Sequence, residues 1–83
     1  MEVSRLVKMA NDIGAFFEAD QDPARGAAGV ADHIRKFWDP RMRREILIHL
    51  DERGGEGLRP IVLEALRNHG RELAPRVGHD GPC

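Results

Sequence analysis

The sequence predicts a small all-α protein: a compact bundle of about four short helices over residues 1–70, followed by a disordered C-terminal tail over residues 71–83. Three observations predict this class. Apolar residues recur at steps of three and four, which is the spacing of one helical face. Asp-Pro pairs and glycine runs divide the chain into segments of helical length. No run of alternating β-branched residues is present. The length of 83 residues suits one domain.

The first helix is expected to run from about Glu2 to Ala19. Phe16 lies beside its apolar stripe and is expected to widen it. The polar segment 18–22 follows and ends the helix. The stripe itself consists of Val3, Leu6, Val7, Ala10, Ile13 and Phe17.

The second helix is expected to begin at Asp22-Pro23. Aspartate is a good N-cap, and proline suits the first helical position because its missing N–H costs nothing there. The helix should stop by about Trp38, since a residue before proline avoids the helical region. Gly26 and Gly29 either allow a neighbouring helix to approach closely or let the first turn fray. The apolar stripe consists of Ala27, Val30, Ala31, Ile34, Phe37 and Trp38.

The third helix begins at a second start signal of the same kind, Asp39-Pro40. It is expected to run to about Glu52 and to end at the Arg53-Gly54-Gly55 run, because glycine is the usual residue just past a helix C-terminus. Its inward residues are expected to be Met42, Ile46, Leu47 and Leu50.

The fourth helix is expected to start between Leu58 and Pro60 and to end at Gly70. The remaining segment, 71–83, contains two prolines and two glycines and has little to bury, which predicts a disordered tail. The inward stripe of the helix consists of Leu58, Ile61, Val62, Ala65 and Leu66.

Composition excludes several classes of function. Cys83 is the only cysteine, so the chain alone forms no disulfide, no Cys-rich zinc site and no iron–sulfur cluster. The net charge of −1 gives no overall attraction to nucleic acid or anionic membrane. No stretch approaches the roughly 20 apolar residues of a membrane span. The N-terminal residues do not resemble a signal peptide, and we expect a cytoplasmic protein.

No catalytic, cofactor-binding or metal-binding residues are predicted. Ser4 is the only serine, and its place at the start of a helix offers no positioned base. No two of the four histidines are spaced as in a zinc-binding HExxH motif, and we interpret them as surface or capping residues. The Gly54–Gly57 run is interpreted as a turn, because no strand precedes it and no Gly-Lys-Ser/Thr follows it. The histidines are His33, His49, His69 and His79.

The segment 35–44 is the most unusual part of the chain, since it combines two aromatic residues with five basic ones at a helix–helix corner. Three interpretations are open: a core tryptophan with solvated arginines around it, a protein interface, or a basic helix pair that binds nucleic acid. Of these, nucleic-acid binding is the least favoured. The candidate interface residues are Phe37, Trp38, Asp39, Pro40, Arg41, Arg43 and Arg44, with Trp38 expected to be half core and half interface.

Three segments together resemble a known family. They are LVKMANDIGAFF at 6–17, VADHIRKFWDPRMR at 30–43 and GGEGLRPIVLEAL at 54–66. In this order they resemble the delta subunit of the bacterial NAD-dependent, molybdenum-containing formate dehydrogenases, over about residues 5–68. The run Phe37-Trp-Asp-Pro-Arg-Met42 is the most distinctive part, and the segment from Gly70 onward is outside the resemblance.

The resemblance implies a non-catalytic accessory subunit that assembles with the alpha, beta and gamma subunits of a cytoplasmic complex and stabilises it. It implies that this chain binds no cofactor. The partner subunits are implied to carry molybdenum pterin, iron–sulfur clusters and flavin, and to perform formate oxidation and NAD reduction. One alternative is a transient maturation factor that holds the apo-catalytic subunit. A less favoured one is a small helical nucleic-acid-binding protein.

Overall fold

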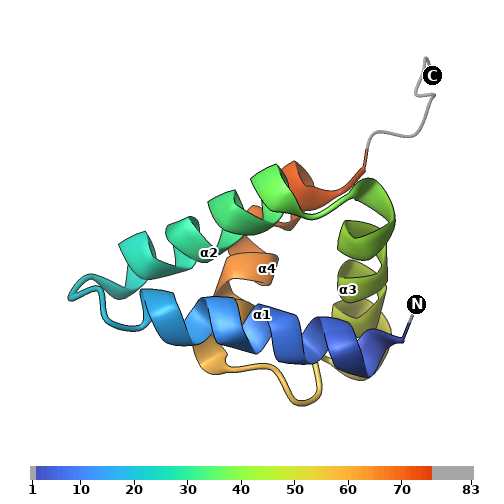
Figure 1. The fold of residues 1–83 in the computed structure, drawn as a ribbon, viewed down its shortest axis with the longest axis horizontal. Helices are drawn as coiled ribbons and strands as arrows, with labels where there is room; N and C mark the ends of the chain where they lie inside the picture. The colour runs from blue at the N-terminus through green and yellow to red at the C-terminus, as the bar shows by residue number, and fades with distance from the viewer. Residues whose placement is uncertain (1, 76–83) are drawn as a thin grey trace.

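The computed structural model describes residues 2–75 and shows the four predicted helices in the predicted order (Figure 1). Within this range it contains no strand, so the all-α prediction is confirmed. Helices α1 and α2 lie antiparallel, α3 lies across one end of this pair, and α4 packs chiefly against α2. The elements are α1 (Val3–Phe17), α2 (Pro23–Phe37), α3 (Pro40–Arg53) and α4 (Pro60–Leu73).

Both predicted Asp-Pro start signals are confirmed. The Asp22 carboxylate accepts a hydrogen bond from the backbone N–H of Ala24 at 3.0 Å, and that of Asp39 accepts one from Met42 at 2.9 Å. Each following proline occupies the first turn of its helix. The caps use backbone donors that a helix N-terminus otherwise leaves without partners.

The end of α3 is also as predicted, with Gly54 in the left-handed region at φ 65°. Gly55 and Gly57 have positive φ as well, and within residues 2–75 no strand precedes this segment, which joins α3 directly to α4 as a tight turn. The His49 side chain closes this turn, because its Nε2 donates to the backbone carbonyl of Glu56 at 2.8 Å.

A second set of hydrogen bonds holds the same turn against α1. The Asn11 side chain donates through Nδ2 to the carbonyl of Gly57, and its Oδ1 accepts from the backbone N–H of Arg59, both at 2.9 Å. One amide thus satisfies a donor and an acceptor of the turn, in addition to the turn's own backbone hydrogen bonds from the N–H groups of Gly55, Glu56 and Leu58.

Close approach between α1 and α2 depends on the two glycines at the start of α2. A Cβ at Gly26 would lie 2.8 Å from the carbonyl oxygen of Phe17, and one at Gly29 would overlap the Phe17 ring. The helix begins at Pro23, so the first turn is formed. Of the two expectations for these glycines, close packing of a neighbouring helix is the one observed.

The core contains residues from all four helices and from the corner after α2. Val30 and Ile34 of α2 and Val62 and Leu66 of α4 lie at its centre with 0–1% exposure. The other members with the same low exposure are Leu6, Ala10, Ala27, Ile46, Ala65 and Leu73.

The predicted end of α4 at Gly70 is wrong, because the helix continues to Leu73. The Leu73 side chain is 0% exposed and belongs to the core. Residues 71–73 are therefore part of the helical bundle, although the tail was expected to begin at residue 71. The rest of the expected tail, from residue 76 to residue 83, lies outside the described residues.

Candidate protein-interaction surface

The α2–α3 corner separates its two aromatic residues. Phe37 ends α2 with 71% of its surface exposed, whereas Trp38 is 5% exposed and belongs to the core. Trp38 lies four residues after the buried Ile34, in line with the α2 stripe, whereas Phe37 lies four residues after His33 on a neighbouring face. Two expectations are therefore wrong. Phe37 is not part of the inward stripe, and Trp38 is not half exposed.

Asp39 and Pro40 have a local structural role at this corner. The Asp39 carboxylate caps the N-terminus of α3, and Pro40 begins the helix. Both residues are exposed. They fix the direction in which α3 leaves the corner and hence the direction of the arginines that follow.

Three arginines on the first turns of α3 form what we call the basic corner: Arg41, Arg43 and Arg44. Within residues 2–75 none of them makes an ion pair. Arg41 and Arg44 are exposed. Arg43 is half-buried, and its Nε is hidden from solvent without a hydrogen-bond partner among these residues.

The other two basic residues of the segment are already paired. Arg35 and Lys36 lie 2.8 Å and 3.2 Å from the two carboxylate oxygens of Asp32, one turn back on α2. Hydrogen bonds from Arg35 and then Lys36 hold the pKa of Asp32 below its ordinary value. One carboxylate offsets only one of these two positive charges, so the basic corner carries most, and Arg35 and Lys36 the rest, of the segment's uncompensated positive charge.

A second feature of this surface, the aromatic groove, lies between α1 and α2. Ile13, Phe16, Phe17 and His33 line a hollow there, and the His33 ring packs against Phe37 with centroids 4.7 Å apart. Phe16 meets Phe17 edge to face at 5.0 Å. We define the aromatic groove by these five residues. Its two outer rings, Phe16 and Phe37, are 74% and 71% exposed.

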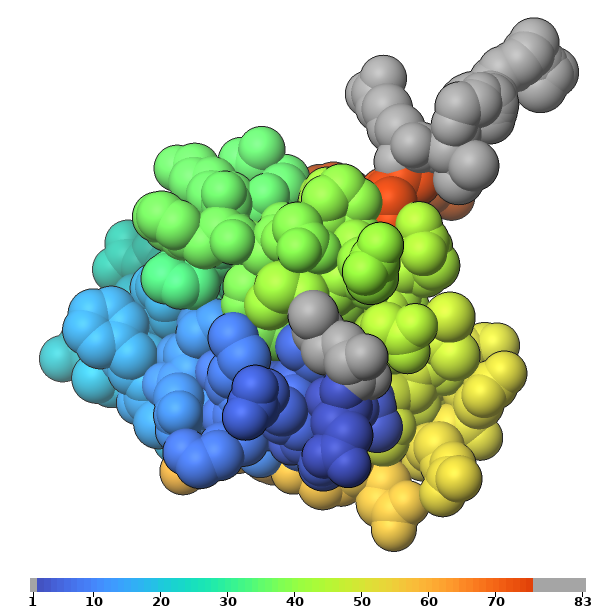
Figure 2. All heavy atoms as spheres, turned by 45° about the vertical axis from the view of Figure 1, so that its right-hand side comes forward, coloured from blue at the N-terminus to red at the C-terminus, as the bar shows by residue number. Residues whose placement is uncertain are grey.

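The contribution of α1 to this surface was not predicted from the sequence. Phe16 was expected to widen the buried stripe of α1, but it points away from the core. A signal was available in the spacing from the predicted stripe residue Ala10, because Phe17 follows it at i+7, on the same helical face, whereas Phe16 follows it at i+6. Figure 2 shows α1 in blue and the α2–α3 corner in green and yellow-green on one face of the molecule.

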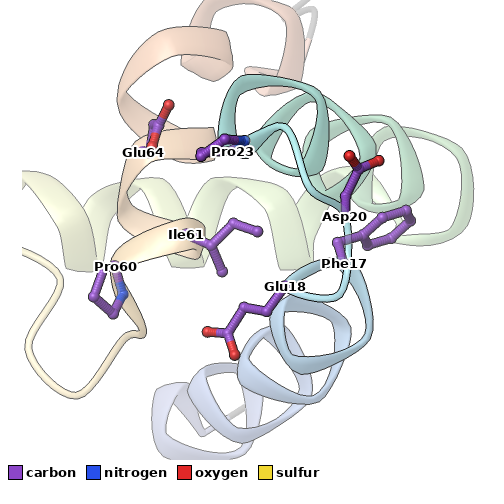
Figure 3. Close-up of a pocket in the computed structure, with 7 residues that line it drawn as sticks. All are labelled: Phe17, Glu18, Asp20, Pro23, Pro60, Ile61 and Glu64. Carbon is purple, nitrogen blue, oxygen red and sulfur yellow. The ribbon is translucent and has the colours of Figure 1, made fainter.

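A separate hollow with acidic residues lies where the α1–α2 turn meets the start of α4 (Figure 3). Its carboxylates, on Glu18, Asp20 and Glu64, do not converge on one point. Arg59 donates to both oxygens of Glu18 at 3.1 Å. Asp20 accepts from the backbone N–H of Asp22 at 2.9 Å, and Arg25 lies 3.3 Å away.

Through these contacts Glu18 and Asp20 hold the α1–α2 turn in place. The hydrogen bond from the Asp22 backbone keeps the pKa of Asp20 below its ordinary value, and the Arg25 guanidinium lowers it further. No cluster of metal-ligating side chains is found within residues 2–75. We therefore interpret this hollow as part of the scaffold.

The described histidines and the single serine make local contacts. His33 packs on Phe37, His49 closes the α3–α4 turn, and His69 Nδ1 lies 3.5 Å from Glu72. Ser4 donates to the Glu2 carboxylate on the exposed first turn of α1. His79 lies outside the described residues. Within residues 2–75 no helix has the length and apolar character needed to cross a membrane.

Comparison with known proteins gives one family match. The family model described as "NADH-dependent formate dehydrogenase delta subunit FdsD" matches residues 5–66, which is more than half of the chain. The matched range includes the aromatic groove and the basic corner and stops before Leu73. No curated protein and no solved structure matches the chain.

Proposed function

Because the chain belongs to the family of NADH-dependent formate dehydrogenase delta subunits, we propose that it is a non-catalytic accessory subunit of such an enzyme. In this role it assembles with the alpha, beta and gamma subunits of a cytoplasmic, molybdenum-containing complex and stabilises it. The family match over residues 5–66 is the observation that carries this proposal.

The surface chemistry supports a binding role. Phe16 and Phe37 each expose most of a phenyl ring, and such rings are frequent anchors of protein interfaces when they lie close together. The described histidines and most of the clustered carboxylates have structural partners instead of facing a common site. Under this proposal the chain binds no cofactor, and the molybdenum pterin, iron–sulfur clusters and flavin belong to the partner subunits.

The proposal is tested by expressing the alpha, beta and gamma subunits with and without this chain. We expect less assembled complex without the chain, and faster thermal loss of formate-dependent NAD reduction. Supplying the chain should restore both quantities. The variant Ile34→Asp, which places a charge in the centre of the core, is the negative control because it abolishes the fold.

Equal yield and equal thermal inactivation with and without the chain contradict the stabilising role. If only the initial yield depends on the chain, and the mature enzyme is indifferent to it, the role is transient and precedes maturation.

A further inference from the structure

The aromatic groove continues along both helices that form it. On α1 the residues Met9, Ile13 and Phe16 fall at i, i+4 and i+7, so they share one face, and Met9 is 37% exposed. On α2 the residues His33 and Phe37 fall at i and i+4. From Met9 to Phe16 the helix rises about 10 Å, which is two helical turns. The exposed face is long enough to receive two turns of another helix.

The charges at the two ends of this face differ. At the end where α1 turns into α2, Glu18 and Asp20 are paired with Arg59 and Arg25. At the other end, Phe37 leads into the basic corner, where Arg41 and Arg44 are exposed and make no ion pair within residues 2–75. The face therefore has one end with uncompensated positive charge.

We propose that the groove between α1 and α2 receives an amphipathic helix of a partner subunit, with apolar side chains in the groove and acidic side chains against Arg41 and Arg44. Recognition of this kind places apolar residues at i, i+3 or i+4 and i+7 into a preformed groove. Arginine suits the acidic end because its guanidinium pairs with a carboxylate through two hydrogen bonds. This inference rests on the proposed function, which supplies the partner.

A second copy of this chain fits the groove less well. Two of the carboxylates that it would offer, Glu18 and Asp20, already have arginine partners on their own chain. Its exposed Asp51 and Glu52 lie on α3, the helix that also carries Arg41 and Arg44, so they would bring positive charges toward the basic corner. A partner helix with unpaired carboxylates gains more from Arg41 and Arg44.

The direct test is photo-crosslinking within the assembled complex. A photoreactive residue is introduced as Phe37→p-benzoylphenylalanine or Phe16→p-benzoylphenylalanine, and the chain is co-expressed with the alpha, beta and gamma subunits. Asn68→p-benzoylphenylalanine is the control, because Asn68 is exposed on α4 and lines neither the aromatic groove nor the hollows beside the basic corner. We expect crosslinks from positions 16 and 37 to one apolar, acid-flanked helical segment of a large subunit.

Affinity measurements test the same contact energetically. Phe16→Ser combined with Phe37→Ser should weaken binding to the complex by at least about 100-fold, since each ring is expected to act as an anchor. Arg41→Glu combined with Arg44→Glu should slow association and reduce its dependence on salt. Asn68→Ser should leave the affinity and the association rate unchanged. Because all of these side chains are exposed, circular dichroism melts should show each variant folded.

The outcomes separate this inference from the proposed function. If the chain remains in the complex but crosslinks from positions 16 and 37 reach only a second copy of itself, or if position 68 alone crosslinks to a large subunit, the groove is not the docking site. Unchanged affinity of the double phenylalanine variant leads to the same conclusion. Absence of the chain from the purified complex overturns both proposals.

Discussion

At the scale of single residues, Asn11 is the most informative side chain in the fold. It satisfies two backbone groups in the α3–α4 turn, and its partners lie 46 and 48 positions away along the chain. The helix caps at Asp22 and Asp39 were predictable because each acts on its own helix. The role of Asn11 was not predictable, because it depends on how α1 meets a distant turn.

Replacing Asn11 with alanine should lower the free energy of unfolding by about 1–3 kcal/mol, since the backbone groups of Gly57 and Arg59 lose their partner. Urea denaturation followed by circular dichroism measures this change. Asn68→Ala on the exposed surface of α4 is the control and should change stability by less than about 0.5 kcal/mol. Equal effects of the two variants would show that the Asn11 bridge does not hold the turn.

The Asp20 carboxylate predicts a dependence of stability on pH. Its pKa is lower in the folded protein than in the unfolded chain, so ionised Asp20 favours the fold above the unfolded pKa. This contribution disappears as the pH falls through the folded pKa, below about pH 4. The melting temperature of Asp20→Asn should therefore lie below that of the unmodified chain at pH 7 and approach it at pH 3. A constant difference across this range contradicts the assignment, and Asp51→Asn serves as the exposed control.

At the scale of elements, hydrophobic spacing and Asp-Pro signals predicted all four helices, but the end of α4 was misjudged. Gly70 was interpreted as a terminator, yet the helix continues and buries Leu73 completely. A glycine inside a helix costs about 1 kcal/mol, whereas burying a leucine contributes about 1.5–3 kcal/mol. The gain from burying Leu73 exceeds the cost of Gly70, so the helix continues. This gain depends on a tertiary contact, which local sequence patterns do not reveal.

Leu73→Ala should therefore destabilise the protein by about 2–5 kcal/mol, the usual cost of truncating a buried leucine. Glu72→Ala, at the neighbouring exposed position, should have an effect near zero. Thermal melts of the two variants provide the comparison. A small effect at Leu73 would place this residue outside the core, as the sequence had suggested.

The turn between α3 and α4 offers a matched pair of glycines. Both have positive φ, but a Cβ at Gly54 would meet nothing within 4 Å, whereas one at Gly55 would overlap the Leu63 side chain. Gly54→Ala should cost about 1–2 kcal/mol, the penalty for placing an alanine in the left-handed region. Gly55→Ala should cost more, because steric overlap adds to the same backbone penalty. If the denaturation midpoint of Gly55→Ala equals or exceeds that of Gly54→Ala, Gly55 is not packed against Leu63 as the structure shows.

At the scale of the whole molecule, the candidate surface was only partly predictable. The sequence located the basic and aromatic corner at residues 37–44, and it suggested an interface. It could not show that Phe37 faces solvent while Trp38 is buried, because the two residues follow Ile34 at i+3 and i+4 and only tertiary packing decides which ring is covered. It also could not show that Phe16 lies near His33, since this proximity follows from the packing of α1 on α2.

The central claim is that this chain is a resident accessory subunit, and native mass spectrometry of the purified formate-oxidising complex tests it most directly. We expect the active complex to retain this 9.3 kDa chain in fixed stoichiometry with the alpha, beta and gamma subunits. We also expect Phe16→Ser combined with Phe37→Ser to reduce this occupancy. A fully active, stable complex that contains no copy of the chain would show that the chain is not a resident subunit.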